Sequence, residues 1–159
     1  MTHEKVDNAW FVADFPSKVE VTVEASDGIS QTTEFAAETQ PFGIFVVRAT
    51  QMPVDPFVAA GARKWVELFG DDWVKNFAQY NPEILRDLAD TVVGGARREL
   101  VFRMDYQGTC GAFTRIVSHP DGYFGRILVC SAVVDWAAES ETSAFRFLNS
   151  VRAKWLPAR

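Results

Sequence analysis

Residues 127–134 read Ile-Leu-Val-Cys-Ser-Ala-Val-Val, with an apolar side chain at almost every position. Successive side chains of a strand point to opposite faces of a sheet, so a strand of this composition has to be covered on both faces. Residues 42–47, Phe-Gly-Ile-Phe-Val-Val, show the same pattern. We therefore predict two central strands in a sheet that carries a layer of structure on each side.

The first third of the chain predicts more strands. Residues 10–15 end at a proline, which is tolerated at strand ends, and residues 31–37 predict a more polar strand. Residues 18–24 alternate between polar and apolar side chains, which predicts a half-buried strand. The side chains expected on its buried face are Val19, Val21 and Val23.

The middle of the chain predicts helices. Asp55-Pro56 matches a helix start, with Asp as the N-cap, and apolar residues then recur at helical spacing as far as Gly70. Asn81-Pro82 repeats this start, and Gly94-Gly95 matches a helix end. The apolar stripe of that second helix is Leu85, Leu88 and Val92.

The last third predicts three strands and a helix. Residues 100–105 alternate, and residues 112–118 and 123–134 flank the turn Pro120-Asp121-Gly122 as a hairpin. A final helix is expected to begin near Ser140. Its expected buried residues are Ala144, Phe145, Leu148, Val151 and Trp155.

This order of elements predicts an α+β fold in one domain, residues 1–159. Because two strands are apolar on both faces, we expect an antiparallel sheet covered by helices on both faces, an α/β/α sandwich. The sequence contains no repeat, no low-complexity tract and no linker.

Four short motifs carry a resemblance to a known superfamily. They are the strand 11–16 ending in Phe-Pro, the Gly-Ala-Arg-Arg-Glu run 95–99, the segment 123–128, and the helix 144–152 containing Phe-Leu-Asn-Ser-Val-Arg. In this order they resemble the PsbP-like superfamily, which includes the Ran-binding Mog proteins and many bacterial proteins of unknown role. The resemblance implies an α/β/α sandwich that acts through protein contacts, and it transfers no catalytic residue to this chain.

Composition excludes several partner classes. The net charge is -5, whereas a protein that binds nucleic acid normally carries a basic face, so we expect no nucleic-acid partner. Arg97, Arg98 and Arg103 cluster, but alternation along a strand can place them on a solvated face, which is what we expect. The sequence contains no run of 18 apolar residues, so we expect no membrane span. The polar amino terminus predicts a cytoplasmic protein, with a removed export signal as the alternative.

No catalytic or metal-binding constellation is evident. The two histidines, His3 and His119, lie in a polar leader and beside a turn, and no zinc motif is present. Cys110 and Cys130 flank the predicted hairpin; we expect buried free thiols, with a disulfide as the alternative. Asp71-Asp72 fits a helix cap with a first-turn acid better than a paired acid and base. We therefore predict no catalytic residue, no metal and no cofactor.

A set of five aromatic residues has helical spacing and is open to two interpretations. Its members are Trp65, Phe69, Trp73, Phe77 and Tyr80. They can pack on the sheet, or some of them can form an exposed recognition patch. With no catalytic signal, the leading prediction is a non-catalytic protein-binding or assembly module whose partner is another protein. The alternative is a small-molecule-binding domain or a cryptic enzyme with a pocket between helices and sheet, holding polar groups such as Arg103, Asp105 or Tyr106.

Overall fold

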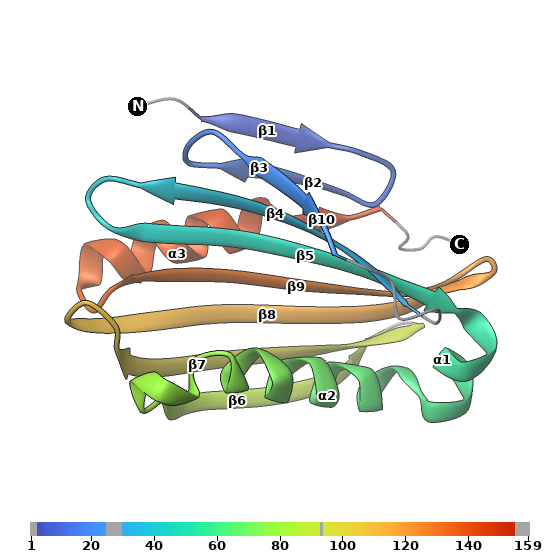
Figure 1. Cartoon of the computed structure of the whole chain (residues 1–159). Coiled ribbons are helices and arrows are strands. Elements are labelled where there is room, and N and C mark those ends of the chain that lie inside the picture. Colours follow the sequence, from blue (N-terminus) through green and yellow to red (C-terminus); the bar gives the residue numbers. More distant parts are fainter. Residues whose placement is uncertain (1–2, 25–29, 93, 155–159) are drawn as a thin grey trace.

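A seven-stranded antiparallel sheet forms the centre of the molecule (Figure 1). The structure, a computed structural model, describes residues 3–24, 30–92 and 94–154 of the 159-residue chain. The strands of the large sheet, in spatial order, are β3 (Glu20–Val23), β4 (Gln31–Thr39), β5 (Gly43–Pro53), β9 (Phe124–Asp135), β8 (Thr109–Asp121), β7 (Gly95–Asp105) and β6 (Glu83–Val92).

The two strands predicted to be central are central. β9 lies between β5 and β8, and its residues from Ile127 to Val134 are all buried. β5 lies between β4 and β9, with Val47 paired to Cys130. Since neighbouring strands cover their backbone groups and other layers cover both faces, these residues meet water on no side.

A second, smaller sheet and one helix cover the first face of the large sheet. The small sheet has the order β1 (Glu4–Asp7), β2 (Phe11–Phe15) and β10 (Arg152–Ala153), and α3 spans Ala138–Ser150. Phe11, Phe15 and Phe147 pack from this layer against Phe45, Val47 and Leu128 of the large sheet.

Two helices cover the second face. α1 spans Val54–Ala60 and α2 spans Ala62–Lys75, followed by a 3-10 turn over Ala78–Tyr80. Gly61 separates the helices with a φ of 93°, which a residue with a side chain rarely adopts. Phe57, Val66 and Trp73 pack from this layer against Leu100, Ile116 and Ile127 of the sheet. Figure 1 shows α2 in front of β6 and β7, with α3 on the far side of the sheet.

The predicted α/β/α sandwich is therefore wrong. The described residues form ten strands in two sheets and only three α-helices, so the molecule is mainly antiparallel β. The layer on the first face is a sheet with one helix beside it, because the two amino-terminal strands and the last strand pair with one another instead of joining the large sheet.

The largest local error is the second predicted helix, which is strand β6. Glu83 pairs with Arg103 and Val92 pairs with Gly95, so β6 and β7 form a hairpin and Gly94-Gly95 lies in its turn region instead of ending a helix. A β-bulge lies between Ile84 and Arg86. Side chains on one face of a regular strand are two or four residues apart, and the residue inserted at a bulge makes one of these steps odd. The steps of three and four residues that suggested a helix therefore also fit this strand.

Three smaller predictions are also wrong. Pro53, not Asp55, precedes the first residue of α1, and no side chain caps that helix. Gly70 lies inside α2, where Arg98 and Leu100 approach it, and does not end a helix. Val21 and Val23 are 57% and 61% exposed because β3 is a short edge strand.

In α3, Ala144 and Leu148 are buried as expected, whereas Phe147 is buried and Phe145 only half-buried. The predicted helix residue Val151 lies just beyond the end of α3, and Trp155 lies outside the described residues.

Arg98 links α2 to the β6–β7 hairpin and is not on a solvated face. Its guanidinium donates to both carboxylate oxygens of Asp87 at 2.9 Å, to Asp71 at 3.0 Å and to the carbonyl oxygen of Glu67 at 2.8 Å. Arg98 is only 8% exposed, so these acceptors satisfy a nearly buried charge. Asp71 is therefore an ion-pair partner and not a helix cap.

We expect Asp87→Asn to lower the free energy of unfolding by about 1 kcal/mol at neutral pH, because the carboxylate is half exposed and solvent screens the pair. The hydrogen bonds from Arg98 lower the pKa of Asp87 below its ordinary value of 3.8. The loss of unfolding free energy in Asp87→Asn should therefore be complete above pH 3.8. It should shrink as the pH falls through the lower pKa that Asp87 has in the folded protein. Urea denaturation across this range measures it. Asp105→Asn, which removes an exposed carboxylate at the end of β7, is the control and should cost little; an equal loss in both variants would contradict the assignment.

Candidate functional site

A pocket of about 340 Å³ opens on the first face of the large sheet, where α3 ends and β10 begins. Its lining comes from four strands of the large sheet and from the chain around β10. The lining residues are Val92, Ala96, Arg97, Arg115, Val117, Ser118, Leu128, Cys130, Leu148, Val151, Arg152 and Ala153.

The floor of the pocket is apolar because of strand alternation. Val117 of β8 pairs directly with Leu128 of β9, and Arg115 pairs with Cys130, so all four side chains project from the same face. Leu128 is fully buried and Cys130 is 4% exposed. The floor is thus a continuation of the core that packs beneath α3.

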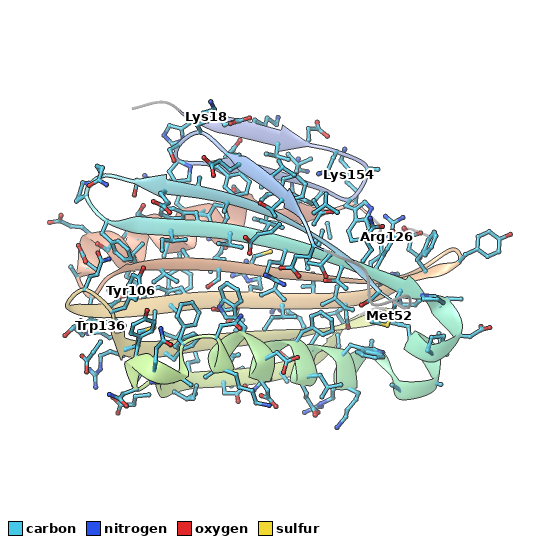
Figure 2. All side chains as sticks on the ribbon, viewed as in Figure 1. Lys18, Met52, Tyr106, Arg126, Trp136 and Lys154 are labelled. Carbon is cyan, nitrogen blue, oxygen red and sulfur yellow. The ribbon has the colours of Figure 1, made fainter. Side chains whose placement is uncertain are left out.

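The wall of the pocket is held by the small sheet. After the last turn of α3, Arg152 pairs with Val12 and Ala153 pairs with Phe11 of β2. The backbone N–H of Lys154 donates to the carbonyl oxygen of Trp10 at 2.8 Å. The guanidinium carbon of Arg126 lies over the Trp10 ring, 4.5 Å from its centroid. Figure 2 shows Lys154 and Arg126 at this end of the molecule.

Among the residues that the structure describes, three arginines and no carboxylate contribute to the lining. Arg115 has protein partners: it donates to Glu99 at 3.2 and 3.3 Å, and more weakly to Asn149 at 3.3 Å and the carbonyl oxygen of Leu148 at 3.4 Å. It therefore positions the end of α3 on the sheet. Arg97 and Arg152 are exposed, and neither forms an ion pair with a residue that the structure describes.

Acidic side chains lie near both exposed arginines but outside the lining. Asp90 lies opposite Arg97 in the β6–β7 register. The pKa of Asp7 is lowered chiefly by its hydrogen bond from Lys154, with a smaller contribution from the charge of Arg152. The charges of the two arginines are thus partly compensated by neighbouring carboxylates, while their donor groups form no ion pair with a described residue and remain available to a ligand.

The thiol in the pocket belongs to a deeply buried cysteine, Cys130. Burial raises the pKa of Cys130 to about 12, although the charge of Arg115 acts in the opposite direction. At neutral pH the group is a neutral thiol that behaves as a small apolar side chain. Burial also raises the pKa of Cys110, whose Sγ lies 2.8 Å from the carbonyl oxygen of Tyr106. The two cysteines are free, as expected, and belong to the core clusters on opposite faces of the sheet.

The five aromatic residues singled out in the sequence lie on the second face, away from this pocket. Trp73 is buried and its indole N–H donates to Ser131 Oγ at 3.1 Å, while Trp65 donates to the carbonyl oxygen of Phe57 at 3.0 Å. Phe77 contacts Phe102, and Trp65, Phe69, Phe77 and Tyr80 are half-buried against the second core cluster. Most of the surface of these five side chains is therefore buried by packing on the sheet.

The polar groups expected in a pocket lie elsewhere too. Arg103 forms an ion pair with Glu83 at 2.6 Å and lies over the Trp136 ring at 5.6 Å. Tyr106 packs edge-on against Tyr80 at 4.7 Å, and Figure 2 labels Tyr106 and Trp136 at the end of the molecule opposite Lys154. Arg103 and Asp105 line only a shallow hollow of about 270 Å³.

Within residues 3–24, 30–92 and 94–154, no three His, Cys, Asp or Glu side chains gather as metal ligands would. None of the helices described there is long and apolar enough to cross a membrane.

Sequence reasoning missed this pocket because it depends on where α3 ends relative to the strands. Arg115 and Val117 at alternate positions of β8 were a usable signal, since they place a cation and an apolar group on one face. Nothing in the sequence shows that β10 pairs with β2, and that pairing closes the wall.

Comparison with protein-family models and with curated protein sequences finds no match to this chain. The PsbP-like resemblance therefore stays a prediction that rests on its four motifs.

We expect Cys130→Ala to change how stability depends on alkaline pH. Above pH 9.0 the unfolded chain loses the proton of this thiol, whereas the folded protein keeps it until about pH 12. The wild-type free energy of unfolding should thus fall with rising pH over this window, by up to about 1.4 kcal/mol per pH unit from this group. The alanine variant should lack this component, so the difference between the two proteins narrows or changes sign as the pH rises. Denaturant titrations at increasing pH measure it, and parallel pH profiles would refute the assignment.

Proposed function

We propose that this domain binds a small amphipathic anion in the pocket between α3, β10 and the large sheet. The observation that carries the proposal is an apolar floor bordered by arginines, with no carboxylate among the described residues of the lining. The ligand class is a carboxylate or a phosphate ester attached to a short acyl chain or a single ring.

The size and composition of the pocket support a small molecule. Small-molecule sites usually occupy roughly 300–1,000 Å³ and combine an apolar lining with a few polar groups. At about 340 Å³ this pocket lies near the lower limit, which favours a medium-length chain over a long lipid.

The arginines support an anionic head group. Guanidinium groups bind carboxylate and phosphate oxygens through paired hydrogen bonds. Arg97 of β7 and Arg152 of β10 both line the pocket, and neither is engaged in an ion pair with a described residue. A ligand head group placed between them would meet donors from both arginines.

We propose binding without catalysis. A reaction at this site would need a nucleophile or a general base within reach of the ligand. The described lining residues include a neutral buried thiol, Cys130, and one residue with a hydroxyl, Ser118, whose Oγ donates to the carbonyl oxygen of Ala62 on the second face at 2.7 Å. Neither group is arranged for that chemistry.

Protein binding is our second proposal. The observation that favours it is exposed apolar surface where α1 meets the β8–β9 hairpin: Val58 is 60% exposed and Tyr123 86% exposed. The backbone N–H of Val54 donates to the carbonyl oxygen of Tyr123 at 2.9 Å, so this end of the molecule is held together. Failure of the ligand experiment below would favour this role.

We expect octanoate, a carboxylate with a medium-length chain, to raise the melting temperature of the protein, whereas octanol should do so far less. A ligand present at 100 times its dissociation constant adds roughly 2.7 kcal/mol of stability. Arg97→Ala and Arg152→Ala should each weaken octanoate binding by about three- to tenfold, because each removes a charged donor that is partly screened by water. Calorimetric titration checks the affinities.

Two variants complete the experiment. Arg63→Ala, an exposed arginine of α2 on the opposite face, is the matched control and should bind as the wild type does. Val117→Phe places a ring on the floor and should abolish binding while the protein stays folded. Absence of stabilisation by octanoate and by octyl phosphate, or equal weakening in Arg63→Ala, would refute the pocket as the binding site.

A further inference from the structure

We propose that the free edge of β6 pairs with β6 of a second copy of this chain, which makes the protein a dimer with one continuous sheet. This inference is independent of the pocket and of its ligand. It concerns the edge of the large sheet at which β6 has β7 on one side and no described strand on the other.

β6 is an unusual edge strand because it is long and exposes three apolar side chains between its charged ones. It spans ten residues, whereas the opposite edge strand β3 spans four. Ile84, Leu85 and Leu88 are 45%, 43% and 52% exposed. An edge strand presents unpaired backbone donors and acceptors along its open side, and such an edge pairs readily with another strand unless it is short, charged or covered.

No described layer covers this edge. α2 packs chiefly over β7 and β8, and α3 packs over β8 and β9 and against β2 of the small sheet. The β-bulge lies between Ile84 and Arg86, so the strand is regular from Arg86 to Val92. This regular stretch is long enough to form a ladder with a second strand.

The charges along β6 are self-complementary in an antiparallel arrangement. Leu88 pairs with Glu99 and Asp90 pairs with Arg97, which places Arg86, Leu88 and Asp90 on the same face of the sheet. A two-fold axis through Leu88 sets Leu88 opposite its own copy. The same axis sets Arg86 opposite Asp90 of the second copy, and Asp90 opposite Arg86, so two ion pairs flank an apolar contact.

The neighbouring symmetric registers lack this match. Centring the axis on Asp87 sets two carboxylates opposite each other, and centring it on Ala89 sets Leu88 opposite Asp90. A pairing that is offset by one residue, instead of two, would set the face that carries Leu88 beside the opposite face of the second copy. The charge pattern therefore selects a second copy in one register over an unrelated apolar strand.

Sedimentation of the full-length chain over a concentration series tests the proposal through a charge swap. The wild type should dimerise reversibly, and more weakly at high salt. Arg86→Glu and Asp90→Arg should each raise the dimer dissociation constant about tenfold or more, because attraction becomes repulsion in two symmetric pairs. The double variant Arg86→Glu/Asp90→Arg restores opposite charges and should recover most of the affinity.

Leu88→Lys tests the same contact without relying on Arg86, which also pairs with Glu99 at 3.5 Å. It sets two like charges together on the axis and should give a monomer with an unchanged melting profile at low concentration. Val21→Lys is the matched control, since Val21 is 57% exposed on the opposite edge strand. A wild type that remains monomeric at every concentration, single variants that dimerise as the wild type does, or a charge swap without recovery would each overturn the proposal.

Discussion

The structure depends on covering strand β9 on both faces. Leu128, Val129 and Cys130 are successive residues with no more than 4% exposure, so the chain has to supply a layer above and a layer below them. It supplies two different layers: α1 and α2 from the middle of the sequence, and a small sheet with α3 from its two ends. Since β1 and β2 meet β10 only after the whole chain has folded back, the amino- and carboxyl-terminal segments stabilise each other on the same face.

This division of the cover explains where the pocket lies. Helical side chains of α3 fill the space over β8 and β9 as far as Leu148, and the chain then continues as the two-residue strand β10. A short strand with Ala153 at its inner position fills less volume than a helix does, so the apolar floor stays partly uncovered. Arg115 fixes the end of α3 beside this opening, and Arg97 and Arg152 border it. The features that would recognise a ligand are thus consequences of how the first face is covered.

The sequence predicts the parts of this fold in which one residue pattern dominates. The two-sided apolar runs predict β5 and β9 as central strands, and the alternation of Leu100, Phe102 and Met104 predicts the buried face of β7. It fails at β6, where a bulge imitates helical spacing, and at β3, whose valines alternate correctly but lie at an exposed edge. The pocket and the burial of Arg98 were beyond reach, because both require knowing which distant segments become neighbours.

Under the proposed function, the ligand binds in the pocket on the first face and not at the aromatic set on the second face. The most direct measurement is an NMR titration with octanoate that follows methyl and backbone signals. Binding in the pocket predicts saturable shifts at Val117, Leu128 and Leu148, with little change at Trp65 and Trp73. Shifts that centre on Trp65 and Trp73, or no shift in the pocket at concentrations that stabilise the protein, would contradict it.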